Sequence, residues 1–169
     1  YDKYARLTKC AETACSWFQS NLTKTIGSNA RDYLKNRGLS PETISKFKLG
    51  YAPDARGDLQ KHLEEKGFTL QDMQEIGLIK NGYEYFRGRV IFPITNAKGI
   101  AIAFGGRILG EGEPKYLNSP ETEIFHKRKT LFGKAIARKP SFETKELIIT
   151  EGYMDVISLN QAGFSHAVA

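Results

Sequence analysis

The sequence is poor in cysteine, with only Cys10 and Cys15 among its 169 residues. The two lie in a C-x₄-C spacing within a stretch of helical pattern, and no second pair of cysteines or histidines accompanies them. A zinc site needs about four ligands, so this pair does not form one. The pattern is typical of two reduced, partly buried thiols in a cytoplasmic protein.

Long apolar runs are also absent. No segment has the length and hydrophobicity that a membrane-spanning helix needs, and no signal peptide is recognisable. Internal repeats and low-complexity segments are missing as well. We therefore expect a cytoplasmic protein that has no membrane partner.

The composition is ordinary for a folded protein, with 40% hydrophobic and 26% charged residues. A chain of this length holds one domain or two small ones with a real core. The formal net charge is +6 and the pI is about 9.3. This balance is consistent with a polyanionic partner, although many basic proteins have none.

The most informative stretch is Glu146–Gly163, ELIITEGYMDVISLNQAG. Its apolar, β-branched start at Leu147–Thr150 predicts a buried strand. Tyr153–Ala162 has helical spacing, and Gly163 is placed to end that helix. HAVA at His166–Ala169 predicts the beginning of the next strand. The stretch is therefore a β-α-β unit, and the carboxyl end of its first strand is where ligands collect in parallel sheets.

Glu151 stands at that strand end, and Asp155 lies four residues further on. A lone glutamate here is commonly a solvated turn residue. However, Gly152 allows a tight turn with close approach to a ligand, and one helical turn brings both carboxylates to the same cleft. Hard cations such as Mg²⁺ bind such oxygen ligands. We therefore expect Glu151 and Asp155 to be metal ligands, with two carboxylates too few to define the site alone.

The chain before this stretch mixes short helices and strands. Asn81-Gly82 is a strong hairpin signal, and Pro93 indicates a sheet edge or a bulge. Ser40 and Pro41 are placed to start a helix. We expect helices at 1–26, 28–37, from 40 onward, 59–66 and 69–76, and strands at 49–51, 78–79, 83–86, 89–94 and 100–104.

Basic, aromatic and amide side chains gather in the loops around these strands. Guanidinium groups bind phosphate bidentately, and cations interleaved with an aromatic ring suit single-stranded nucleic acid. A solvated basic face is the alternative, and we favour it for the run Lys127–Lys129. Ser119 is also placed to cap a helix. The candidate nucleotide- and DNA-binding residues are Arg37, Arg87, Arg89, Arg107, Lys115, Tyr116 and Asn118.

Several segments together resemble one family. IITEGYMDVISLNQAG is similar to the first motif of a Toprim fold as bacterial, DnaG-type primases carry it, and RVIFPI, GIAIAFGGR and PKYLNSPETEIFHK resemble further signature blocks of the same primases. The resemblance implies an α/β fold: an α+β N-terminal subdomain of the RNA polymerase core at 1–140, followed by the first β-α unit of a Toprim subdomain at 141–169.

The resemblance also implies a function, namely DNA-directed synthesis of short RNA primers on single-stranded DNA for replication. Glu151 matches a metal ligand or acid/base group, with Mg²⁺ or Mn²⁺ as cofactor. Implied partners are the template, ribonucleoside triphosphates, the RNA primer and, through a separate C-terminal domain, the replicative helicase. Zinc would belong to a separate N-terminal domain, and the location would be the bacterial nucleoid. A non-catalytic module that binds single-stranded nucleic acid and a Toprim nuclease or topoisomerase are the alternatives.

One family feature is missing from the sequence. The second and third Toprim motifs, which include an Asp-x-Asp pair, do not occur within residues 1–169. We therefore expect residues 1–169 alone to make no primers, whereas the full-length protein does. An assay with template, Mg²⁺ and labelled nucleotides tests this, and metal-dependent primers made by residues 1–169 alone would contradict it.

Overall fold

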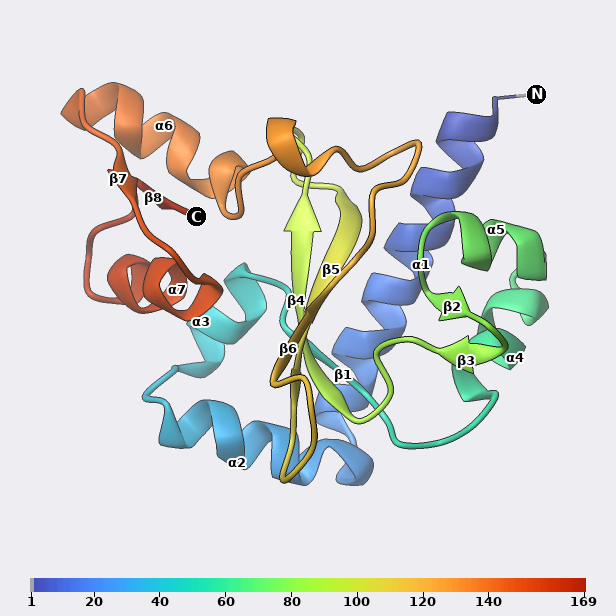
Figure 1. Cartoon of the computed structure of the whole chain (residues 1–169). Coiled ribbons are helices and arrows are strands. Elements are labelled where there is room, and N and C mark those ends of the chain that lie inside the picture. Colours follow the sequence, from blue (N-terminus) through green and yellow to red (C-terminus); the bar gives the residue numbers. More distant parts are fainter. Residues whose placement is uncertain (1) are drawn as a thin grey trace.

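The computed structural model describes residues 2–169, and it confirms the predicted mixture of helices and strands (Figure 1). An antiparallel four-stranded sheet of order β1-β4-β5-β6 forms the centre, and two-stranded sheets β2-β3 and β7-β8 lie on opposite sides of it. The strands are β1 (Gly50–Ala52), β2 (Ile79–Lys80), β3 (Tyr83–Glu84), β4 (Arg89–Thr95), β5 (Ala101–Ile108), β6 (Tyr116–Asn118), β7 (Ile148–Ile149) and β8 (Ala167–Val168).

Seven α-helices and two short 3₁₀ helices surround these strands in the described part of the chain. The longest, α1, runs along the central sheet (Figure 1). The helices are α1 (Lys3–Thr23), η1 (Thr25–Gly27), α2 (Ser28–Asn36), α3 (Pro41–Lys46), α4 (Asp58–Glu65), α5 (Leu70–Glu75), η2 (Lys127–Lys129), α6 (Lys134–Thr144) and α7 (Tyr153–Gln161).

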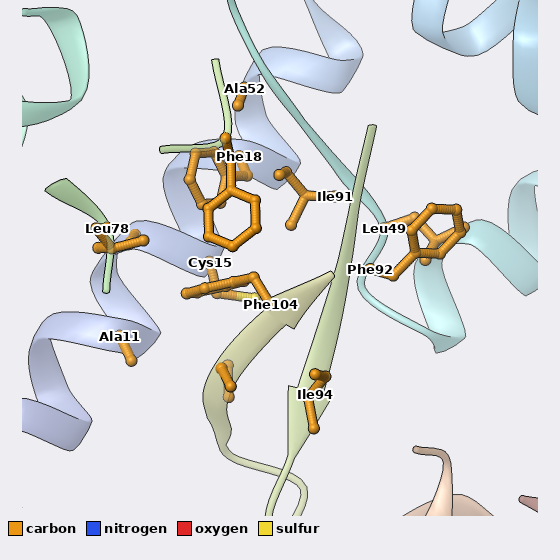
Figure 2. Packing of buried hydrophobic residues seen from close by; sticks show 14 of the residues in the cluster. Ala11, Cys15, Phe18, Leu49, Ala52, Leu78, Ile91, Phe92, Ile94 and Phe104 are labelled. Carbon is orange, nitrogen blue, oxygen red and sulfur yellow. The ribbon is translucent and has the colours of Figure 1, made fainter. Parts of the chain in front are cut away.

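The β4-β5 hairpin is buried on both faces, as its continuous apolar sequence predicts. Figure 2 shows Phe18 and Ile91 on one side of β4, and Leu49 and Phe92 on the other. Phe18 of α1 meets Phe104 of β5 edge to face, with ring centroids 5.4 Å apart. Helix α1 thus covers one face of the sheet, and α3 and α7 lie toward the other (Figure 1).

Local signals place several turns as predicted. Ser40 caps α3 by accepting a hydrogen bond from the Thr43 N–H, and Pro41 takes the first helical position. Asn81 and Gly82, both with positive φ, join β2 to β3. These elements depend on neighbours in sequence, which is why the sequence alone predicts them.

Pro93 has no backbone N–H to donate, and the sheet tolerates this at its position in β4. In the described part of the chain, β1 pairs with Arg89–Ile91 of β4 and does not reach Pro93, so β4 is unpaired beside Pro93 on that side. The pairing of β4 with β5 also shifts between Ile94 and Thr95. The proline therefore lies at a local sheet edge next to an irregularity, as predicted.

The C-terminal β-α-β unit forms with β7 and β8 parallel, and Gly163 at φ +100° follows the end of α7. Within residues 2–169 the first strand is not buried as predicted, since Leu147 is 48% exposed and Ile149 is 72% exposed. Among these residues β7 pairs with β8 alone, which leaves its other edge and part of its faces uncovered.

Helix α6 runs continuously through the predicted subdomain division at residue 140, which stays a prediction. The segment before α6 pairs with the chain after β8. The Phe132 N–H donates to the Ala169 carbonyl over 2.7 Å, and the Ala169 N–H donates to the Phe132 carbonyl over 3.2 Å. The predicted C-terminal unit therefore shares backbone hydrogen bonds with residues well before its boundary.

The side chain of Gln161 ties the end of α7 to the loop between α2 and α3. Its Oε1 accepts from the Ser40 N–H over 2.7 Å, and its Nε2 donates to the Gly38 carbonyl over 2.6 Å. The neighbouring Asn160 accepts at its Oδ1 from Lys46 Nζ over 3.0 Å. These bonds fix α7 against the helices that lead into the central sheet.

Both cysteines are free and buried. Burial raises the pKa of Cys10 to about 12 and that of Cys15 to about 11, so both thiols stay protonated and unreactive. Across residues 2–169, none of the helices combines the length and apolar character that crossing a bilayer requires.

Asp72 joins α5 to α1. Its Oδ2 accepts from Arg6 Nε over 3.0 Å, from Arg6 Nη2 over 2.8 Å and from the Thr69 N–H over 2.8 Å. Burial opposes ionisation of Asp72, but the hydrogen bonds from Arg6 and Thr69 outweigh it and lower the pKa. The Asp72 carboxylate therefore belongs both to the capping box with Thr69 and to the ion pair with Arg6.

We expect Asp72→Ala to reduce the free energy of unfolding by about 2 kcal/mol at neutral pH, because a partly buried guanidinium and a backbone donor lose this acceptor. A folded-state pKa below the unfolded value gives stabilisation above the unfolded pKa of about 4, lost as the pH falls through the folded value. Urea unfolding at pH 7 and in acid measures both effects. Asp32→Ala, at an exposed position on α2, is the control. A difference that persists undiminished in acid would contradict the assignment.

Candidate nucleic-acid interface

A groove of about 580 Å³ is lined by residues of the central sheet and of the β7-α7-β8 unit. Apolar side chains, among them Phe125 and Phe132, form part of its wall. The groove brings together five of the predicted site residues: Arg37, Tyr116, Asn118, Glu151 and Asp155. Carboxylates, a guanidinium, a phenol ring and an amide therefore face one space.

The two carboxylates stand where β7 leads into α7. Glu151 follows the strand, and Asp155 lies in the first turn of the helix. Both are exposed, and no hydrogen bond or ion pair within residues 2–169 engages either side chain. The same residues contain no group of three or more histidine, cysteine, aspartate or glutamate side chains placed to hold a metal. The pair therefore offers part of an oxygen ligand set for a hard cation.

Tyr153, the first residue of α7, anchors the carboxylates to the sheet. Its ring stacks on Phe92 of β4, with centroids 5.6 Å apart, and meets Phe132 at 4.7 Å. A Cβ atom on Gly105 of β5 would lie 2.4 Å from the ring, so the contact needs glycine there. Burial raises the pKa of Tyr153 to about 12, and its hydroxyl donates to Asn118 Oδ1. Because that bond occupies Oδ1, the Asn118 amide nitrogen remains to donate to a ligand.

A second cluster surrounds Tyr33 of α2. The guanidinium carbon of Arg37 lies 5.8 Å from the centroid of the Tyr33 ring, and that of Arg107 lies 5.0 Å from it. Arg107 of β5 is paired in register with Tyr116 of β6. Two predicted binding arginines from distant parts of the chain therefore meet at one aromatic ring beside the groove.

Arg89, by contrast, is buried and bonded within the sheet, and its role as a nucleic-acid contact stays a prediction. It is only 4% exposed, and its Nη1 donates to the carbonyls of Gly106 and Lys115 over 3.3 and 3.2 Å. The arginine holds the start of β6 against β4 and β5. Its position before an apolar strand gave no indication of this, because the partner carbonyls come from strands further along the chain.

Arg87, Arg107 and Lys115 are not among the residues that line the groove. Arg87 Nε forms a 2.9 Å ion pair with Asp54 Oδ1, and its side chain borders a small cavity beside Trp17. Lys115 is exposed and directly precedes Tyr116. The structure thus separates Arg87 from the other predicted cations. Lys115, in contrast, adjoins Tyr116, the residue paired with Arg107 of the Tyr33 cluster.

The two glycines before Arg107 serve packing. Gly105 receives the Tyr153 ring, and a Cβ on Gly106 would lie 2.8 Å from Phe86 and 3.0 Å from the Arg89 stem. The predicted helix beginning at Ser119 does not form. Ser119 is fully buried, and its Oγ accepts from the Phe104 N–H over 2.9 Å, which binds the end of β6 to β5.

Sequence reasoning missed four residues of this region: Tyr33, Tyr153, Lys127 and Thr130. Tyr153 directly follows Glu151-Gly152, and that position was the available signal. Lys127 lines the groove although its basic run favours a solvated face. Tyr33 lies on an amphipathic helix and carries no local signal, since its partners come from elsewhere in the chain.

The fold and the groove define a class: an α/β protein that places carboxylates at a strand end opposite a cationic, aromatic surface. Residues 17–138 match the family model of the DNA primase catalytic core, N-terminal domain, and the chain belongs to this family. The DNA primase of Deinococcus radiodurans is 47% identical over an alignment 162 residues long, which covers 92% of this chain and 28% of that protein.

Solved structures agree with this assignment. A DnaG primase catalytic domain bound to single-stranded DNA superposes with a TM-score of 0.91 at 40% identity, over 99% of this chain and 54% of that one. The zinc-binding and RNA polymerase domains of the Aquifex aeolicus primase give 0.92 at 33% identity, over 100% and 42%. The zinc-binding domain is a separate part of that protein. This chain spans about a quarter of the D. radiodurans primase and about half of these solved chains.

We expect Gly105→Ala to lower the free energy of unfolding by about 1–3 kcal/mol, because the new methyl group overlaps the Tyr153 ring. Urea unfolding measures the loss. The double variant Gly105→Ala/Tyr153→Ala should lose less than the sum of the two single variants, because removing the ring makes room for the methyl group. Strictly additive losses would show that the two residues do not meet.

Proposed function

We propose that the protein to which this chain belongs is a DNA primase, which synthesises short RNA primers on single-stranded DNA. The observation that supports this most strongly is the shared groove: Glu151 and Asp155 line it together with Arg37 and Tyr116. A polymerising site needs carboxylates for metal ions and cations for phosphates within one cleft. Membership of the primase core family supports the same reading.

In this proposal, Arg37, Arg107 and Lys115 bind phosphate groups of nucleotides, primer or template, since none of them forms an ion pair with a carboxylate in residues 2–169. Tyr116, which is 42% exposed, stacks on a base or sugar. The amide nitrogen of Asn118 donates to a base edge or a sugar oxygen. Lys127 adds a further cation from the groove wall.

Glu151 and Asp155 contribute to a Mg²⁺ or Mn²⁺ site. Their exposed carboxylates, which have no protein partner within residues 2–169, fit a hard cation, and two such groups are an incomplete ligand set. A bound divalent ion would neutralise phosphate charge and activate the attacking 3′-oxygen. Tyr153 holds Glu151 at the groove by fixing the start of α7 on the sheet.

The proposed partners are the single-stranded template, ribonucleoside triphosphates and the RNA primer, with the replicative helicase bound through a separate C-terminal domain. Zinc would belong to a separate N-terminal domain, and the protein would act in the cytoplasm, at the bacterial nucleoid. We also propose that residues 1–140 form the N-terminal subdomain of the polymerase core and that residues 141–169 begin a Toprim subdomain.

We expect Glu151→Gln in the full-length protein to reduce primer synthesis on the order of a hundredfold while single-stranded DNA binding changes little. Labelled ribonucleotides on a single-stranded template measure synthesis. Glu143→Gln, at an exposed position on α6 outside the groove, is the control. If the unaltered full-length protein cleaves the template instead of making primers, it is a Toprim nuclease. If it binds the template without either reaction, it is a binding module.

We expect replacement of both Arg107 and Lys115 by glutamate to weaken single-stranded DNA binding at least about tenfold, because two phosphate contacts are lost and reversed in charge. The dependence of log K on log salt should become shallower by about 1.4. Fluorescence anisotropy with a labelled oligonucleotide at several salt concentrations gives both values. Replacement of both Lys61 and Lys66 by glutamate, at exposed positions on α4 and directly after it, is the control. Equal affinity of the double variant and the unaltered protein would refute the assigned binding surface.

A further inference from the structure

Tyr33 has an unusual set of neighbours for a helix tyrosine. Arg37 follows it by one turn of α2, and Arg107 comes from β5. Both guanidinium carbons lie within 6 Å of its ring centroid, at 5.8 and 5.0 Å. A cation at this distance from an aromatic face is attracted by the ring quadrupole. The ring is therefore a contact common to two cations that are far apart in sequence.

The Tyr33 ring carries no charge of its own. Burial raises the pKa of its phenol, the nearby Tyr116 raises it further, and the opposing effect of Arg107 and Arg37 is smaller. The hydroxyl is buried, and the side chain that interacts with it is that of Tyr116. The phenol thus stays neutral at physiological pH, and the ring face, rather than an ionised oxygen, holds the arginines.

Neither arginine forms an ion pair with a carboxylate within residues 2–169. Arg107 donates from Nη1 to the Ile108 carbonyl, and its Nε is buried without a partner. A carboxylate in place of Tyr33 would also hold two guanidinium groups, but it would cancel part of their charge. An aromatic face orients them and leaves their charge and part of their N–H edge for phosphate oxygens.

We propose that Tyr33 is a positioning residue, which holds Arg37 and Arg107 at a fixed separation so that the two guanidinium groups bind phosphates of single-stranded DNA as a pair. This inference rests on the proposed function of the same groove. It assigns the effect to the ring face, because both guanidinium carbons lie within 6 Å of the ring centroid. It also explains why arginines from α2 and β5 act on one ligand.

Three variants of the full-length protein test the role of the ring. Tyr33→Leu removes the aromatic face and should weaken single-stranded DNA binding about tenfold, with a shallower salt dependence, because two phosphate contacts lose their alignment. Tyr33→Phe keeps the ring and should bind within about twofold of the unaltered protein. Tyr83→Leu, at a 64% exposed tyrosine on β3 across the central sheet from α7, is the matched control.

A double-variant cycle separates positioning from a general loss of stability. If Tyr33 acts through Arg107, the effects of the two substitutions should not be independent. The variant Tyr33→Leu/Arg107→Gln should then lose much less affinity than the product of the fold-losses of the two single variants. All binding affinities should be measured well below the melting temperature of each variant. A purely structural role would instead lower the melting temperature and leave the affinity and salt dependence of the folded fraction unchanged.

Two results would overturn the proposal. Unchanged binding by folded Tyr33→Leu would show that the ring does not position the arginines. Equal losses in Tyr33→Phe and Tyr33→Leu would assign the effect to the hydroxyl. Failure of the proposed function has a different signature: the variant with glutamate at both 107 and 115 would then bind single-stranded DNA normally.

Discussion

The arrangement of the groove depends on one contact, that of the Tyr153 ring with the backbone of Gly105. Only a hydrogen at position 105 leaves room for the ring, which then stacks on Phe92 and donates its hydroxyl to Asn118. Because Glu151 lies two residues before Tyr153, seating the ring fixes where the strand-end carboxylate stands. The β7-α7-β8 unit and the central sheet thereby become two walls of one site.

The charges of this site are kept available rather than cancelled. Its carboxylates have no protein partners in the described chain, and its two arginines rest on an aromatic ring instead of on acids. Arg89, which donates to the carbonyls of Gly106 and Lys115, is buried and holds strands together. The fold therefore separates structural cations from binding cations, a distinction that residue type alone does not make.

The sequence predicted what depends on near neighbours. The hairpin at Asn81-Gly82, the cap at Ser40 and the β-α-β unit around Glu151 all follow from local rules, and the structure has them. The misses depend on strand pairing. Arg89 and Ser119 are buried because β6 pairs with β5, and Tyr33 matters because α2 lies near β5. No rule based on spacing along the chain identifies such partners.

The amide of Gln161 has a mechanical consequence. It clamps the end of α7 to Gly38 and to Ser40, directly after Arg37, while the start of α7 carries Asp155 and follows Glu151. A single rigid helix thus connects the acidic end of the cleft to the backbone beside a cationic side chain. Thermodynamic linkage makes such a connection reciprocal. If a polyanion bound at one end changes the affinity of the other end for a cation by some factor, the bound cation changes the affinity for the polyanion by the same factor.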